Sequence, residues 1–197
     1  VKADSPLKSG KELLARLVKD PASLSGGMTS RGGAAQITLG KALKANGGDP
    51  KKPKLVVFKS GGEATTALLG GHVDYAITVV PSVMGQVQSG QLRIIAIAAP
   101  QRLSGPLSNV PTLKEQGTDV VGSNWRIVVG PKGMSAAQIA FWDGALGKMV
   151  QTDEWKKDLK DSEQEFVYLN SRDTAKYLDA QNKDLTEALI DLGLVKQ

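Results

Sequence analysis

The chain has 197 residues, a net charge of +5 and a hydrophobic fraction of 41%, which is ordinary for a globular protein and too high for a disordered one. No run approaches the roughly 18 consecutive apolar residues that a membrane helix needs, so we expect a protein that is not membrane-embedded. The 25 basic residues are scattered among 20 acidic ones and aromatic residues make up only 5%, so we expect no nucleic-acid partner.

The chain begins VKADSPLKSGKELL, which is charged and amphipathic, unlike a secretory leader. Two interpretations follow: a cytosolic protein, or a sequence that begins downstream of its true start.

Helix and strand patterns alternate along the chain. Ser9 and Glu12 have capping-box spacing and open the first expected helix, which Pro21 ends. The second expected helix is opened by the loop TSRGGAAQ and ends near Ala45. The later ones are 63–69, 81–88, a short helix opened by Thr112, one opened by Ser135 and Gln138, a short one after it, and 172–192. The expected strands are short apolar runs: 23–28, 53–59, 75–80, 92–99, 124–131 and 165–169.

This alternation predicts an α/β fold with a mostly parallel sheet. The strand at 53–59 is expected to be buried, and the continuous apolar run 92–99 is typical of a central parallel strand. A boundary is expected near 123–124. Four strands precede it, whereas the two that follow are marginal as an independent sheet. The second part therefore looks incomplete.

Several chemistries have no supporting residues. Without cysteine there are no disulfides, thiolate metal sites or cysteine nucleophiles, and the single histidine, His72, excludes a multi-histidine metal site. The phosphate loop, the Gly-x-Gly-x-x-Gly dinucleotide motif and the Gly-x-Ser-x-Gly elbow are absent. We therefore expect no metal, no cofactor and no enzyme, with His72 at the surface or packed in a loop.

Two glycine-rich loops each join an expected strand to a helix. In the first, Thr29 and Ser30 and the N–H groups of Gly32 and Gly33 are suitable donors for a carboxylate, and Arg31 could clamp one bidentately. The alternative is an exposed loop arginine. Ligands of open α/β sheets sit at the carboxyl ends of strands, so two such loops on neighbouring strands indicate a binding edge.

The second loop runs from Lys59 to Ala64. Ser60 and Glu63 have capping-box spacing, and Gly61 and Gly62 are expected to be the first helical residues. The helix N-terminus favours an anion, but Glu63 would work against one nearby, so a plain capped turn is the alternative.

The sequence around each tryptophan predicts whether its side chain lies in the core or lines a cleft. Trp142 and Trp155 fall on helix stripes and are expected in the core; Ile139, Leu146 and Met149 share the stripe of Trp142. Trp125 follows the expected boundary directly and is a candidate for lining a cleft.

From Lys59 to Gly117 the chain carries a long ordered series of motifs. It contains KSGGEATTALLGGHVDYAI, then PSV, a helix ending in GQLR, an apolar strand and VPTLKEQG. SPLKSGKELL precedes this series and NWRIVVGPKGMS follows it. The chain closely resembles, over essentially its whole length, the substrate-binding receptors of tripartite tricarboxylate transporters, the TctC or Bug family.

The resemblance implies a periplasmic-binding-protein architecture of type II, a Venus flytrap in which two α/β domains close on a small carboxylate. Residues 1–122 would form the second domain and 123–197 the C-terminal part of the first, with a hinge strand near 124–129. The N-terminal half of the first domain would be absent from this sequence. The implied partners are a di- or tricarboxylate, or an aromatic carboxylate, and membrane permease subunits.

Position by position, the resemblance assigns ligand binding to 29–33, 59–64 and Thr78. The first loop, SRGGAAQ, keeps the glycines of the family pattern but loses hydroxyls and adds Arg31. Family members that bind amino acids place an aspartate where this chain has Thr78, which cannot pair with an ammonium group. The resemblance therefore implies a carboxylate ligand without an amine.

Three hypotheses follow. The main one is an extracytoplasmic receptor that captures an organic carboxylate for a tripartite tricarboxylate-type transporter. The second is a ligand-sensing domain that presents its closed form to a signalling partner. An enzyme is third and lacks an identifiable base and nucleophile.

Overall fold

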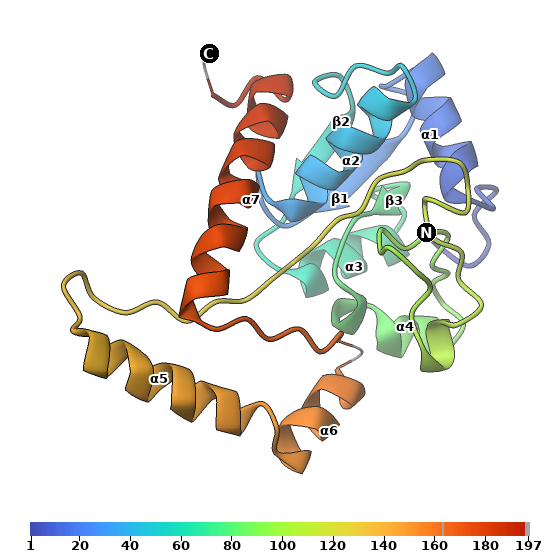
Figure 1. Ribbon diagram of the computed structural model, residues 1–197. Helices are drawn as coiled ribbons and strands as arrows, with labels where there is room; N and C mark the ends of the chain where they lie inside the picture. The colour runs from blue at the N-terminus through green and yellow to red at the C-terminus, as the bar shows by residue number, and fades with distance from the viewer. Residues whose placement is uncertain (163, 196–197) are drawn as a thin grey trace. The chain divides into compact units, whose positions relative to one another are not determined.

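The computed structural model describes residues 1–162 and 164–195. The chain divides into two compact units: the first contains Val1–Asn124 and Thr186–Gln197, and the second contains Trp125–Leu185. Figure 1 labels their helices and strands. The long helix α7 (Ser171–Asp191) belongs to both, because it carries the chain from the second unit back into the first.

A small parallel sheet forms the centre of the first unit. β1 (Ser25–Met28) lies between β2 (Lys54–Val57) and β3 (Tyr75–Ala76), and both neighbours pair with it in parallel. The expected α/β class is confirmed. The expected burial of the second strand is wrong: β2 lies at the edge of the three-stranded sheet that the described residues form, and Val56 and Val57 are exposed.

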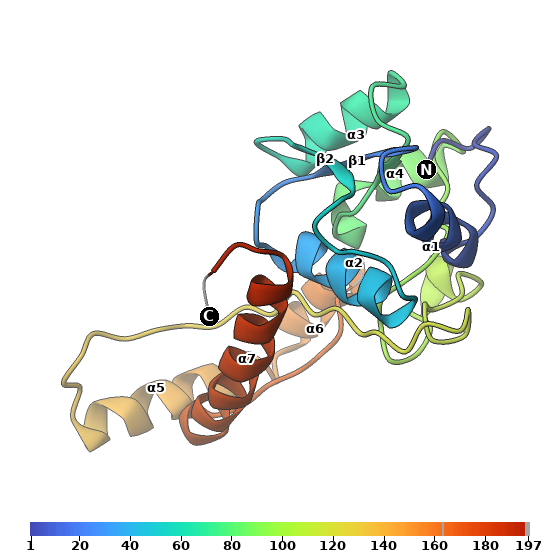
Figure 2. The ribbon, with the colours of Figure 1, turned by 90° about the horizontal axis from the view of Figure 1, so that it is seen from above.

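Helices cover both faces of this sheet. α1 (Gly10–Lys19) and α2 (Ala34–Ala45) pack together over one face, and α3 (Gly61–Leu69) covers the other, as Figure 2 shows from above. The residues of the first core are Val1, Leu7, Leu14, Leu17, Leu39, Ala42, Leu43, Tyr75 and Val120. Those of the second are Ala67, Leu68, Val73, Val83 and Leu92.

Glycine in β1 makes room for the tyrosine of β3. Gly26 pairs with Tyr75, and a Cβ placed on Gly26 would lie 2.5 Å from the tyrosine ring. Tyr75 is only 1% exposed. Burial raises the pKa of its hydroxyl, and that oxygen has no hydrogen-bond partner among the described residues. The ring thus fills the space over Gly26 that a β1 side chain would need.

The expected central strand at 92–99 does not form. The segment makes isolated bridges only, Lys2 with Leu92 and Ile97 with Thr112. The N–H of Arg93 donates to the Val1 carbonyl (2.8 Å), and that of Ile97 donates to the Pro111 carbonyl (3.1 Å), so loops occupy the groups that a strand ladder would need. The described part of the first unit therefore carries three strands rather than the expected four.

The segment 75–88 is also less regular than expected. β3 ends at Ala76, and the helix expected from Pro81 is divided into a 3-10 turn, η1 (Val80–Ser82), and α4 (Met84–Gln88). The break lies at Val83, whose φ of −128° is outside the helical range.

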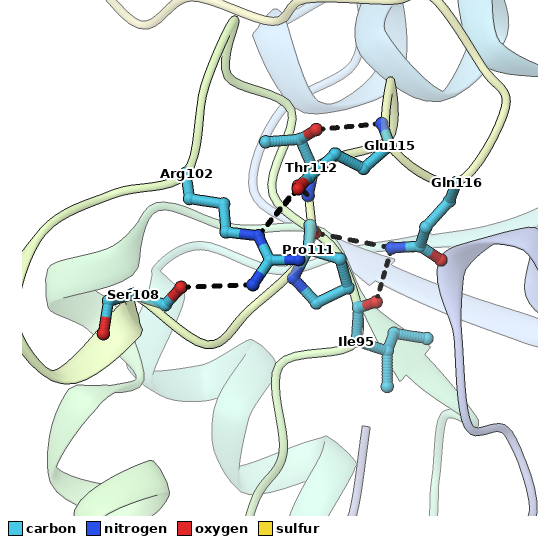
Figure 3. A network of polar contacts seen from close by, with 7 residues as sticks. All are labelled: Ile95, Arg102, Ser108, Pro111, Thr112, Glu115 and Gln116. Atoms are coloured by element: carbon cyan, nitrogen blue, oxygen red, sulfur yellow. Dashed lines mark hydrogen bonds and ion pairs between the residues drawn. The ribbon is translucent and has the colours of Figure 1, made fainter.

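Thr112 and Glu115 form both bonds of a capping box without a helix. The Thr112 N–H donates to Oε2 of Glu115 (2.8 Å), and the Glu115 N–H donates to Oγ1 of Thr112 (3.1 Å). The expected helix here is wrong because Gly117, at a φ of +93°, turns the backbone after one turn. Figure 3 shows how Arg102 joins this network through the carboxylate of Glu115, while Gln116 donates to the Ile95 carbonyl. A further 3-10 turn, η2 (Gly105–Leu107), lies between Arg102 and Thr112 in the sequence.

In the second unit, α5 (Ala136–Met149) begins at the expected hydroxyl residue, and the expected short helix after it is α6 (Asp153–Asp161). Ser135 and Gln138 form the predicted capping box, and Thr152 caps α6. The expected core position of Trp142 is wrong, because its side chain is 53% exposed.

The expected strands at 124–131 and 165–169 are extended segments that pair with no strand in the described chain. Val128 and Val129 are 74% and 78% exposed. Successive residues of an extended chain point to opposite faces, so the described residues cover neither face here. A strand ladder needs a neighbouring strand, and none of the strands in the described residues pairs with these segments. No helix among the described residues is long and apolar enough to cross a bilayer.

Candidate functional site

Parallel pairing brings the carboxyl ends of all three strands to one edge of the sheet. The loop 29–33 leaves β1 there, 58–60 leaves β2, and Thr78 follows β3. The chain runs from β1 to β2 on one side and then returns past β1 to β3 on the other. Such a reversal is the point where open α/β sheets bind ligands. The fold therefore brings both predicted ligand loops and Thr78 to a suitable edge.

Side chains of the loop after β1 and of α2 contact the backbone of that loop. Gly32 has a φ of +70°, which favours glycine, and its N–H donates to Oε1 of Gln36 (2.7 Å). A Cβ placed on Gly33 would lie too close to Oγ of Ser30 for any side chain to fit at this position. Of the two backbone donors predicted here, the Gly32 N–H is thus already used, while Thr29, Ser30 and Arg31 are exposed.

The N-terminus of α2 has no cap of its own. Gly33 is the N-cap residue and offers no side-chain acceptor, and the first turn contains no acidic residue. The unpaired N–H groups of a first turn and the positive end of the helix dipole attract anions. Arg31 adds a positive charge two residues before the cap. This end of α2 has the local chemistry that a carboxylate needs.

The N-terminus of α3 is different, because the chain satisfies it internally. Gly61 and Gly62 begin the helix as predicted, and Oγ of Ser60 accepts from the N–H of Glu63 (3.2 Å). Oε2 of Glu63 accepts in turn from the N–H of Lys59 (3.1 Å). The carboxylate of Glu63 therefore lies at the positive end of the α3 dipole. The next residue, Ala64, is 1% exposed and packs inward.

The packing around position 61 leaves no room for a side chain, which explains the glycine there. A Cβ at this position would lie 2.7 Å from Oγ of Ser82, 2.9 Å from its Cβ and 3.6 Å from Oγ1 of Thr78. Thr65, which is buried, donates from its hydroxyl to the Ser82 carbonyl (3.4 Å) and joins the same segment to α3. Thr78 and Ser82 thus place two hydroxyls beside the start of α3.

Sequence reasoning missed Gln36 and Ser82. Gln36 is the third residue of α2, the position from which Glu or Gln reaches back in a capping box, so its spacing from Gly33 was a usable signal. Ser82 carried no such signal, because its contact with Gly61 depends on how two loops pack.

Trp125 belongs to the second unit. Its ring meets that of Tyr177 edge to face, with centroids 6.3 Å apart, and it is 38% exposed. Its role in ligand binding stays a prediction.

Two other features lie outside the predicted loops. His72 is exposed, and its ring lies close to Gly70. A hollow of about 270 Å³ lies by the opposite, amino edge of the strands and is lined by Lys2, Asp4, Ser5, Pro6, Gly71, Val73 and Asp74. Within the described ranges, no three His, Asp or Glu side chains gather where they could hold a metal ion.

Comparison with known proteins identifies relatives along the whole chain. Residues 1–194 match the model of the tripartite tricarboxylate transporter family receptor. A Cupriavidus necator protein, named UPF0065 protein in gbd 5'region, is 28% identical over 197 residues, which are all of this chain and 58% of that protein.

Two solved structures share the fold. Rpa4515 of R. palustris, solved with adipate, has a TM-score of 0.83 at 19% identity, over 98% of this chain and 64% of that one. MatC from Rhodopseudomonas palustris, solved with bound malate, has a TM-score of 0.73 at 18% identity, over 97% and 64%.

This likeness confirms the expected periplasmic-binding-protein architecture, although the chain spans only about three fifths of the length of these relatives. The chain belongs to the tripartite tricarboxylate transporter family of receptors.

Proposed function

We propose that this chain is an extracytoplasmic, periplasmic solute-binding receptor, which captures a small organic carboxylate and delivers it to the permease of a tripartite tricarboxylate-type transporter. The observation that carries the proposal is the uncapped N-terminus of α2, at the carboxyl edge of the parallel sheet, in a chain matched to this receptor family over residues 1–194. The role is binding without chemistry.

The ligand carboxylate would lie in front of the first turn of α2. The N–H groups of this turn would donate to it, and the dipole of α2 would stabilise its charge. Arg31 is exposed and can present its guanidinium fork to both carboxylate oxygens. The hydroxyls of Thr29 and Ser30 supply further donors beside it.

The proposed ligand carries no amine. Thr78 follows β3 at the same edge and brings an uncharged hydroxyl, which cannot balance an ammonium ion. The adipate of Rpa4515 and the malate of MatC are likewise carboxylates without an amine, which supports the same class of ligand here.

Thermal unfolding with a panel of mono-, di- and tricarboxylates and amino acids tests the proposal. A ligand at a hundred times its dissociation constant adds about 2.7 kcal/mol to the unfolding free energy, which raises Tm by roughly 5–10 °C for a protein of this size. We expect this shift with an amine-free carboxylate and none with the amino acid of equal length. The reverse order contradicts the proposed ligand class.

The transport role needs a separate measurement. Uptake of the identified acid by cells with the matching permease should fall when the receptor is deleted and return when it is restored. Uptake that is unaffected by the deletion contradicts delivery to a permease.

A further inference from the structure

We propose that Glu63 is a specificity-determining residue, which keeps a second ligand carboxylate away from α3 and leaves α2 as the carboxylate end of the site. This inference rests on the proposed function and names the ligand class more closely. In this unit, the receptor takes one carboxylate, and the part of the ligand beside α3 is uncharged.

The two helices that begin at the binding edge differ in charge. α2 has neither a capping side chain nor an acidic residue in its first turn, and Arg31 precedes it. α3 has both a capping hydroxyl, from Ser60, and an acid, Glu63. Their strands are neighbours, separated by the usual spacing of about 4.8 Å. A ligand at this edge therefore meets one attractive helix end and one that already holds a negative charge.

Two bonds fix the carboxylate of Glu63 in place. Its Oε2 accepts from the N–H of Lys59 (3.1 Å), and its own N–H donates to Ser60 (3.2 Å). The negative charge of this carboxylate also complements the positive end of the α3 dipole. A second carboxylate approaching α3 would meet this charge at close range, and like charges there repel.

The other groups at the start of α3 suit an uncharged partner. Oγ of Ser82 and Oγ1 of Thr78 lie against Gly61, and both can donate or accept a hydrogen bond. The ligand class that fits is an acid with one carboxylate towards α2 and a hydroxyl or apolar end towards Thr78 and Ser82.

A matched pair of ligands tests this inference. Hexanoate and adipate have the same chain length and differ by one terminal carboxylate. Their dissociation constants would be measured by calorimetry for the parent chain and for Glu63→Gln, which keeps an oxygen that can accept from Lys59. We expect the parent to bind hexanoate more tightly, and the ratio of the adipate constant to the hexanoate constant to fall about tenfold in Glu63→Gln.

Glu12→Gln is the control variant. Glu12 makes the same two bonds at the start of α1, to Ser9 and to the N–H of Lys8, but lies outside the predicted ligand loops. The control should leave the ratio unchanged. The effect of Glu63→Gln should also shrink in 1 M salt, because salt screens exposed charges.

The outcomes separate the two proposals. An unchanged ratio in Glu63→Gln, or an equal change in Glu12→Gln, overturns the role of Glu63 while leaving carboxylate capture intact. If no acid of the thermal panel binds either protein, the proposed function fails and this inference fails with it.

Discussion

Ser9 and Ser60 have nearly identical backbone angles, φ −148° with ψ 160° and φ −148° with ψ 161°. Each caps its helix by accepting from a glutamate N–H three residues on, and each glutamate accepts from the lysine before the serine. The sequences are KSGKE at α1 and KSGGE at α3. The second loop is therefore first of all a helix-capping motif, and its glycines do not by themselves indicate a ligand.

Removing either cap should destabilise the first unit to a similar degree. Ser9→Ala and Ser60→Ala each leave first-turn N–H groups without their acceptor, so we expect each to lower the unfolding free energy by about 1 kcal/mol. Urea unfolding with matched slopes measures this difference. A large loss for one serine and none for the other would show that the two motifs are not equivalent.

The two glycines of α3 should respond in opposite ways to alanine. A Cβ at position 61 would lie 2.7 Å from Oγ of Ser82, whereas at position 62 its nearest neighbour is Oγ of Ser60 at 3.8 Å. We expect Gly61→Ala to cost about 1–3 kcal/mol through overpacking. Gly62→Ala should gain about 0.5–1 kcal/mol, because alanine loses less backbone entropy in a helix.

A double variant identifies the cause of the Gly61 effect. Ser82→Gly removes the two atoms nearest to a Cβ at position 61, so Gly61→Ala should cost less in that background than in the parent. Urea unfolding of the four proteins gives the coupling energy. Equal costs in the two backgrounds would show that Ser82 is not the obstacle.

Arg31→Ala should weaken binding of the carboxylate ligand by more than tenfold. The substitution removes the guanidinium from the start of α2 and leaves the fold unchanged, since the side chain is exposed. Arg31→Lys keeps the charge but loses the bidentate fork, so its affinity for the carboxylate should lie between those of the parent and of Arg31→Ala. Titration calorimetry of the three proteins measures this order. An unchanged affinity in Arg31→Ala would make Arg31 an ordinary surface residue.

The network of Figure 3 should make stability depend on acid pH. The hydrogen bond from the Thr112 N–H and the nearby Arg102 hold the pKa of Glu115 below its ordinary value. A depressed folded-state pKa adds stability that is complete above the unfolded pKa, near 4.5, and is lost as pH falls through the folded value.

Glu115→Gln tests this dependence. The variant should be less stable than the parent at pH 7, and the gap should close as the pH falls through the folded-state pKa of Glu115, because both side chains are then uncharged. Chemical unfolding at a series of pH values measures the gap. A gap of constant size would mean that the charge of Glu115 contributes nothing.

Local signals in the sequence predicted the helix starts well. Ser9, Ser60 and Ser135 each cap the helix that follows them, because a cap depends only on residues three positions apart. The capping signal at Thr112 produced its bonds but no helix, since Gly117 then turned the chain. The loop 29–33 was also predicted to leave a strand and open a helix, as it does.

The sequence by itself determined the glycine-rich turns, the capped helices and a parallel α/β class, which all follow from short-range pattern. Only the tertiary structure decided which apolar runs become strands: 25–28 found neighbours on both sides, whereas 92–99 and 124–131 did not. It also decided that Gly61 packs against Ser82, and that the helix N-terminus without a capping side chain is that of α2. The physical reason is that strand pairing and loop packing depend on groups far apart in sequence, whose positions no local pattern encodes.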